Sequence, residues 1–384
     1  MKGHIVKRGQ SSWRIKLDVG RSAEGRRISR YRTVRGTKAQ AQAQAALAWL
    51  LIAHDEGLVE PSKATVAEYM RSWIETAANK ADVSPKTAER YRQLIERQIA
   101  PRIGKLELQK LKPAHVADWH GMLLKAGGHE GGPLSARTVG HAHRVLHKAL
   151  ADAVRLELLM RNAAAVAPPP KVEETEVQIL AADQVQATLN ALRTTSIYPQ
   201  VVVLLTTGIR RGELMALQWA DIDFDAGKLS IKRAVEKTKE HGLRINLPKS
   251  KAGTRTIFLP ASALAVLKQH RKSQQELRLK LGLGKISPNA FVFGDINGAV
   301  RDPDRITQDW KRFTAARDLP RVRLHSLRHS SASALIRSGT DPITVSKRLG
   351  HAKPTTTLSL YGHMFDHSDE AAAEAIDAAL KISE

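Results

Sequence analysis

The chain has 384 residues, of which 42% are hydrophobic, so it is long enough for two or three domains with real cores. It contains no cysteine, which excludes disulfides, thiolate metal sites and cysteine nucleophiles and fits a reducing cytoplasm. The formal charge of +23 predicts a polyanionic partner, because a surface so basic repels itself until it is neutralised. DNA is the commonest such partner, and a ribosomal or membrane-surface protein is the alternative on charge alone. We expect no signal peptide and no membrane span, because no apolar run is long enough for either.

Residues 1–58 form a first segment, which we expect to fold as a small β-sheet followed by one helix. Alternation of apolar and polar residues with period two is typical of half-buried strands. The expected strands are 5–6, 12–19 and 27–34. A turn should cover residues 20–25, and the helix should begin at Thr37 and end near Gly57.

This first segment holds nearly half of the charge excess of the chain. Residues 1–40 contain 12 Lys/Arg and 2 Asp/Glu. A basic face on a sheet suits insertion into a DNA groove, and the alternative is a sheet that is merely soluble. The candidate DNA contacts are Arg14, Lys16, Arg30 and Arg32.

Residues 64–165 form a second segment, which we expect to be all helix. Four helix starts are marked by a capping residue or by a proline in the first turn: Thr65, Ser84, Pro113 and Ser135. The last helix should run to about Leu159, and its polar face carries basic residues suited to phosphates: Arg137, Arg144 and Lys148. His143 and His147 are spaced as two metal ligands, but no third ligand lies near, so we expect no metal site.

Residues 166–174 are predicted to be a stiff polar linker, because three prolines are followed by the polar stretch Lys171-Val172-Glu173-Glu174. The linker separates the helical segment from a third segment, residues 175–384. A hinge between two DNA-contacting domains is the natural interpretation, since a clamp must open to admit duplex DNA.

The third segment contains polar motifs whose residue types suit work at a phosphate. Gly208 lies two residues before Arg210, breaks helical regularity and lets a guanidinium approach a ligand closely. Lys251 lies in a basic stretch between two alternating stretches, 243–247 and 256–259, which together predict a β-hairpin with a basic tip.

Further along the third segment, a histidine and an arginine three residues apart, His325 and Arg328, share one helix face. His351 follows Leu-Gly, and Tyr361 comes ten residues later. Taken singly, such residues are usually surface cations, structural histidines or core tyrosines. Only their joint occurrence indicates a site.

These motifs resemble the tyrosine recombinase, or phage integrase, family. The family pattern is an arginine in TGxR, a lysine at a hairpin tip, an HxxR helix, a histidine after Leu-Gly, and a tyrosine in YxH. The positions that the resemblance assigns as catalytic are Arg210, Lys251, His325, Arg328, His351 and Tyr361. We expect Glu213 and His329 to orient these groups. The departures, Ile209 for leucine and Ser326 for aspartate, are not at catalytic positions.

The resemblance implies a multidomain α+β fold. It comprises an arm-type DNA-binding domain with a three-stranded sheet and a helix at 1–58, an all-α core-binding domain at 64–165, and a catalytic domain at 175–384. The catalytic domain should be mainly helical with a small β-sheet, as in the tyrosine recombinase catalytic fold.

The resemblance also implies a reaction: DNA is cut and rejoined through a 3′-phosphotyrosyl link, to integrate or excise a phage or other mobile element. Extra negative charge develops on the phosphate in the transition state. The sequence offers the guanidiniums of Arg210 and Arg328 there, with no carboxylate cluster suited to a metal beside them. One phosphodiester replaces another, so no cofactor is needed.

The remaining groups are assigned to proton transfer and phosphate binding. A phenol with an ordinary pKa of about 10 must lose its proton to attack, and we assign that step at Tyr361 to His325. His351 should hydrogen-bond the phosphate, and Lys251 should protonate the departing 5′ oxygen. We expect Arg211, Arg255 and His363 to be phosphate or surface groups.

The implied partners are double-stranded DNA at core and arm attachment sites, three further copies of the chain in a tetramer, a host DNA-bending protein and an excisionase. The helix expected beyond Ser368 docks either on a neighbouring protomer or on its own domain. A chromosome-dimer resolvase of the same family is one alternative, and the extra basic segment at the N-terminus argues against it. A non-cleaving DNA-binding regulator on the same fold and a metal-dependent nuclease are the others.

Overall fold

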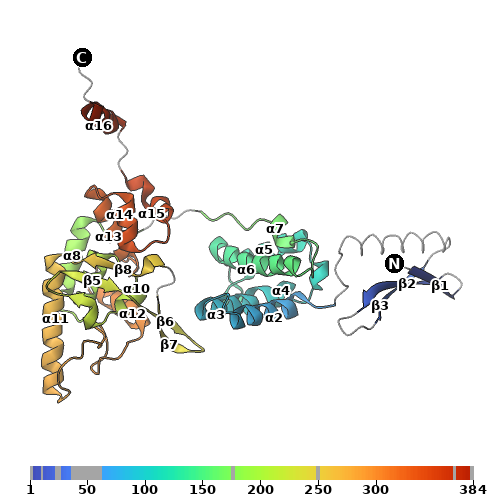
Figure 1. Cartoon of the computed structure of the whole chain (residues 1–384), viewed down its shortest axis with the longest axis horizontal. Helices are drawn as coiled ribbons and strands as arrows, with labels where there is room; N and C mark the ends of the chain where they lie inside the picture. The colour runs from blue at the N-terminus through green and yellow to red at the C-terminus, as the bar shows by residue number, and fades with distance from the viewer. Residues whose placement is uncertain are drawn as a thin grey trace. The chain divides into compact units, whose positions relative to one another are not determined.

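A computed structural model describes residues 3–9, 12–21, 27–35, 63–173, 178–247, 251–365 and 369–380 (Figure 1). The chain divides into two compact units, Met1–Glu173 and Glu174–Glu384. Each unit has a buried hydrophobic cluster of its own. Within the described ranges, no helix has the length and apolar character needed to cross a membrane.

The N-terminal part of the first unit is a three-stranded antiparallel sheet. Its strands, in spatial order, are β1 (Gly3–Gly9), β2 (Ser12–Arg21) and β3 (Arg27–Arg35). The three predicted strands are confirmed. Gly20, which was expected in a turn, lies instead in β2, beside a shift in the register with β3. The helix predicted from Thr37 to Gly57 lies outside the described residues.

The register of β2 and β3 divides the candidate DNA contacts of this sheet between its two faces. Residues directly opposite in an antiparallel pair share a face. Positions 30 and 32 pair with the apolar positions 17 and 15, and therefore lie on the face that positions 14 and 16 do not occupy. The prediction of one basic face is wrong, because the alternation in each strand does not fix how the strands are paired. The Arg14 guanidinium lies 5.6 Å from the centre of the Tyr31 ring.

The rest of the first unit is helical, as predicted. Its α-helices are α2 (Val66–Asn79), α3 (Pro85–Leu94), α4 (Ala100–Ile103), α5 (Pro113–Ala126), α6 (Ala136–Arg155) and α7 (Ala163–Val166). The predicted caps are confirmed, since the Thr65, Ser84 and Ser135 hydroxyls each accept the N–H three residues on. Helix α6 ends before the predicted Leu159, because Glu157 takes a positive φ of 57°, through which no helix continues.

Between α3 and α4 the chain makes a π-helical turn at Ile95–Ile99. Pro101 explains it, because proline has no N–H to donate to the Arg97 carbonyl four residues back. The Arg102 guanidinium donates to that carbonyl at 3.0 Å, and the Ala100 N–H donates to the Ile95 carbonyl. The carbonyls of Ile95 and Arg97 are thus both hydrogen-bonded despite the proline.

Two histidines lie in the core of the helical part. His120 on α5 and His143 on α6 are 6% and 5% exposed, and His120 Nε2 lies 3.1 Å from His143 Nδ1. Such a bond needs one ring to donate and the other to accept, so at least the accepting ring is neutral. No group of three or more potential metal-ligating side chains occurs in the described parts of the chain.

The buried histidine pair makes the folded state sensitive to acid. Burial, followed by the charges of His120 and His147, lowers the pKa of His143 to about 4. An unfolded chain, with an ordinary histidine pKa of about 6.5, takes up this proton first as the pH falls. Stability should therefore decline between about pH 6.5 and about pH 4, by on the order of 2 kcal/mol for this residue.

The His143→Asn variant should lose this part of the pH dependence. Urea unfolding of the whole protein, followed through tryptophan fluorescence at about pH 7 and about pH 4.5, measures the difference. Equal losses of stability in the variant and the wild type would contradict the assignment.

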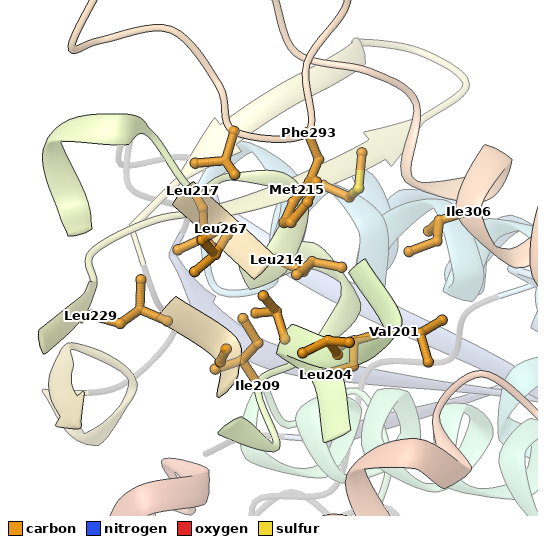
Figure 2. Close-up of a cluster of buried hydrophobic side chains, with 14 of the residues drawn as sticks. Val201, Leu204, Ile209, Leu214, Met215, Leu217, Leu229, Leu267, Phe293 and Ile306 are labelled. Atoms are coloured by element: carbon orange, nitrogen blue, oxygen red, sulfur yellow. The ribbon is translucent and has the colours of Figure 1, made fainter. Parts of the chain in front are cut away.

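The second unit combines helices with two small sheets (Figure 1). Its α-helices are α8 (Ala182–Leu192), α9 (Tyr198–Thr207), α10 (Arg211–Met215), α11 (Ala261–Lys280), α12 (Pro303–Ala315), α13 (Ser326–Arg337), α14 (Pro342–Leu349), α15 (Pro354–Tyr361) and α16 (Asp369–Leu380). The apolar run at 201–205 lies in α9, and Figure 2 shows Val201 and Leu204 gathered with Leu214 and Ile306 in the core. This core holds the segment that follows α9 in place.

The two sheets contradict the hairpin predicted around Lys251. One sheet has the order β4 (Ile222–Asp223), β5 (Lys228–Ile231) and β8 (Arg255–Phe258), and the other pairs β6 (Ala234–Thr238) with β7 (Gly242–Asn246). Strands β7 and β8 flank the basic stretch but do not pair with each other. Strand β7 pairs across a tight turn with β6, which costs less loop-closure entropy than pairing with β8 across the longer basic stretch. Lys251 begins a 3-10 turn, Lys251–Gly253, between the two sheets.

Candidate active site

The first part of the site lies where α9 meets α10. Gly208 ends α9 in the left-handed conformation (φ 66°), and a Cβ there would lie 2.5 Å from the Leu349 side chain. Arg210 then adopts an extended backbone, and its N–H donates to Glu213 Oε2 at 2.8 Å. Its guanidinium donates to Glu213 Oε1 at 2.9 Å and to the Gly350 carbonyl at 2.9 Å. The Arg210 side chain is 43% exposed, so a fixed cation faces solvent.

The carboxylate that holds Arg210 is itself buried. Glu213 is 3% exposed and binds a second guanidinium, that of Arg255, through both of its oxygens. Burial raises the pKa of Glu213, but the hydrogen bonds and charge of Arg255, together with those of Arg210, hold it below its usual value. Arg255, which was expected to be a phosphate or surface group, is 8% exposed and internal. That prediction is wrong, because only the fold brings β8 to α10.

The second guanidinium of the predicted site lies at the start of α13. Arg328 is 4% exposed and its Nη1 donates to the Gly208 carbonyl at 2.5 Å. Burial and then the Arg210 charge lower the pKa of Arg328 to about 10, so it remains a cation at neutral pH. His325 precedes α13, and desolvation, then the Arg328 and Arg210 charges, lower its pKa. Arg328 and His325 both line an open cavity of about 770 Å³.

A histidine follows the end of α14. Gly350 takes the left-handed conformation (φ 70°) and turns the chain, so that His351 Nδ1 lies 2.8 Å from Thr357 Oγ1. Burial and then the charges of Arg328, Arg210 and Arg255 lower the pKa of His351 to about 4. His351 is therefore a neutral ring within electrostatic reach of both guanidiniums.

The tyrosine of the predicted site is the last residue of α15. Tyr361 is 2% exposed and packs in a small cluster with Ala332, Ile336, Val345 and Leu349. Its hydroxyl lies 2.6 Å from His329 Nδ1. Burial raises the pKa of Tyr361 to about 12, and the Arg328 charge offsets only part of this rise. The phenol is thus protonated and hydrogen-bonded to a histidine.

The structure places His329, not His325, on the tyrosine hydroxyl. Burial, then the charges of His325 and Arg328, lower the pKa of His329 to about 4, so its ring is neutral and can accept. The His325 ring packs edge-on against it with centroids 5.0 Å apart. The sequence puts two histidines four residues apart on one helix, and nothing in that spacing says which of them meets the tyrosine.

The structure brings five of the six predicted catalytic residues together: Arg210, His325, Arg328, His351 and Tyr361. Of the sixth, Lys251, only the backbone is described. Arg211 is a surface group, as expected, and donates to Asp304 and Thr307 on α12. The side chain of His363 lies outside the described part of the chain.

Comparison with known proteins identifies the family of this chain. Residues 178–368 match the phage integrase family, and residues 65–124 match the N-terminal SAM-like domain of phage integrases. The chain belongs to the phage integrase family of tyrosine recombinases. A protein named "Tyrosine recombinase XerC-like", from Caldanaerobacter subterraneus subsp. tengcongensis, is 25% identical over 98% of this chain and 98% of its own length.

Solved structures show that the fold is shared within this family. The integrase of the Tn1549 transposon, in complex with a circular intermediate DNA, is 19% identical with a TM-score of 0.68, over 83% of this chain and 99% of that chain. A lambda integrase tetramer bound to a Holliday junction is 15% identical with a TM-score of 0.58, over 94% of each chain.

Proposed function

We propose that this recombinase cuts and rejoins DNA at specific sites to integrate or excise a mobile element, as an integrase. The observation that carries the proposal is the gathering of one phenol, two guanidiniums and a neutral imidazole in one site, from the start of α10, from α13, from the turn after α14 and from the end of α15. The family match and the shared fold with a transposon integrase support it.

The chemistry follows from what each group can do to a phosphodiester. The Tyr361 oxygen attacks phosphorus, the bond to the 5′ oxygen breaks, and a 3′-phosphotyrosyl link forms. Arg210 and Arg328 donate to the nonbridging oxygens, where charge develops. His351 donates a further hydrogen bond to the phosphate, and Lys251 protonates the departing 5′ oxygen. Attack by a 5′ hydroxyl reverses the steps and reseals the strand.

We assign His329 as the group that first takes the phenol proton. It is the neutral base in contact with the hydroxyl, whereas His325 contacts the ring of His329. The phenol is withdrawn from solvent in this structure, so DNA binding must expose it. Tyr361 sits at the end of an eight-residue helix and in a small cluster, which favours such a movement.

Relaxation of supercoiled plasmid DNA in the presence of a chelator tests the reaction class. The plasmid should carry the attachment site of the element. Reversible phosphotyrosyl transfer should give closed, relaxed circles without a nucleotide or a divalent ion. Nicked or linear products that never reseal, or activity that a chelator abolishes, would indicate a nuclease.

We assign the parts of the chain as follows: an arm-type DNA-binding domain at 1–58, a core-binding domain at 64–165, a linker at 166–174 and a catalytic domain at 175–384. Double-stranded DNA is the partner of all three domains. A homotetramer on two duplexes, a host DNA-bending protein and an excisionase complete the proposed assembly. The lambda integrase tetramer on a Holliday junction supports the stoichiometry.

A basic stripe on α6 should contribute to DNA affinity without reading sequence. Arg137, Arg144 and Lys148 are exposed at spacings of seven and four, which is one helix face. Replacing all three with glutamine should weaken binding to every duplex, and the slope of log affinity against log salt should fall by up to about 3. The control replaces Arg71 and Lys110, which are exposed but paired with acids on the chain and lie outside α6, and it should leave the slope unchanged. An unchanged salt slope in the α6 variant would show that this face does not meet DNA.

A further inference from the structure

We propose that Arg255 is a positioning residue of the site: it neutralises Glu213 so that Arg210 remains available to the scissile phosphate. The inference rests on the proposed function, and it concerns a residue that the recombinase motif of this chain does not include. Its basis is a set of contacts that join three separate segments of the site.

The Arg255 guanidinium makes two hydrogen bonds to the Glu213 carboxylate, whereas the Arg210 guanidinium makes one. Arg255 Nη2 donates to Oε2 at 3.0 Å and Nη1 donates to Oε1 at 3.3 Å. Arg210 donates one guanidinium N–H to Oε1 and its backbone N–H to Oε2. A carboxylate that is 3% exposed requires a buried counter-ion, and Arg255, at 8% exposed, is placed to be that counter-ion.

Because Arg255 pairs with Glu213, most of the N–H groups of the Arg210 guanidinium remain free. Of its five N–H groups, one binds Glu213 and one binds the Gly350 carbonyl, and the described contacts use no others. If Arg255 were absent, Glu213 would have Arg210 as its one guanidinium partner. Arg210 would then turn its fork toward the buried carboxylate, using the donors that a phosphate needs.

Arg255 also fixes the backbone on either side of the site. Its Nη1 donates to the Gly253 carbonyl at 3.0 Å, within the turn that begins at Lys251, and its Nε donates to the Arg348 carbonyl at 2.8 Å, just before His351. The guanidinium passes so close to Gly350 that a Cβ there would lie 2.5 Å from Nη1. One buried side chain thus ties together the segments that carry Arg210, Lys251 and His351.

The test measures single-turnover cleavage of a nicked duplex carrying the core site, at saturating DNA. Arg255→Met should lower the cleavage rate constant by about 10²-fold, while the dissociation constant for DNA changes by less than about twofold. Adding the substitution Glu213→Gln to Arg255→Met is the decisive measurement. In Arg255→Met with Glu213→Gln, the carboxylate charge is gone and Arg210 is released, so about tenfold of the rate should return.

Arg233→Met is the matched control for folding. Arg233 also binds a buried carboxylate of the same unit, that of Asp221, whose described hydrogen bonds and ion pairs involve no proposed catalytic residue. It should show a similar drop in Tm with no loss of cleavage rate. Arg255→Lys covers the case in which the methionine variant does not fold. It keeps one charge beside Glu213 but has no fork to bind both carboxylate oxygens, so Arg210 is drawn partly toward Glu213; the variant should lose about tenfold, again restored by Glu213→Gln.

Two results would overturn the proposal: wild-type cleavage by Arg255→Met, or a double variant no faster than Arg255→Met alone. Failure of the wild-type protein itself to form a covalent adduct would instead overturn the proposed function.

Discussion

Tyr361→Phe should abolish the covalent protein–DNA adduct, because the change removes the one oxygen proposed to attack phosphorus. Incubation with a nicked suicide duplex, which loses its 5′ hydroxyl fragment and traps the intermediate, should give a denaturant-stable adduct with the wild type alone. The ring is 2% exposed and keeps its packing in phenylalanine, so only the hydrogen bond to His329 is lost. The cost to stability should be about 1 kcal/mol.

Two measurements accompany this result. DNA affinity of Tyr361→Phe should match the wild type, since a buried hydroxyl contributes nothing to the initial encounter. Tyr198→Phe, at the start of α9 in the same unit, should form the adduct normally. Adduct formation by Tyr361→Phe would remove this residue as the nucleophile.

Arg210→Lys should lower the cleavage rate by about 10²–10³-fold, although the charge is conserved. An ammonium cannot bind Glu213, the Gly350 carbonyl and a phosphate in one plane, as the guanidinium fork does. Lysine at this exposed position should leave folding largely intact. The rate of adduct formation on the suicide duplex measures the loss.

A substrate with a methylphosphonate at the scissile position separates charge stabilisation from misfolding. This group has a methyl group in place of one nonbridging oxygen, so a guanidinium fork has less to bind and Arg210→Lys should lose far less rate on it. Arg312→Lys, an exposed pair with Asp309 on α12, should be normal on both substrates. An equal loss by Arg210→Lys on both substrates would contradict the proposed role of the guanidinium.

Local chemistry explains which parts of the fold could be predicted from the sequence. The helix starts at Thr65, Ser84 and Ser135 depend on hydrogen bonds to residues three positions away, so their signals lie within one turn of chain. The helix break at Gly208 is likewise local, because glycine adopts a positive φ without steric cost. The motif positions could be found because each motif is short and their order is distinctive.

The features that sequence reasoning missed depend on partners far along the chain. Strand β8 pairs with β5 rather than with β7. The buried pair of Arg255 and Glu213 joins residues 42 positions apart. Neither contact produces a periodic pattern in the sequence. His329 and His325 occupy equivalent-looking positions, and only the packing of α15 against α13 decides which of them meets Tyr361. The distribution of basic residues over both faces of the N-terminal sheet follows from the register of β2 and β3, which cannot be read from the sequence of either strand alone.

The two left-handed glycines at the site limit how this enzyme can change. Gly208 and Gly350 each combine a positive φ with a neighbour 2.5 Å from where a methyl group would begin. One neighbour is the leucine before Gly350, and the other is the Arg255 guanidinium. Random mutagenesis should therefore return active variants with single changes at the exposed basic positions of α6, while libraries that randomise these two glycines return inactive clones.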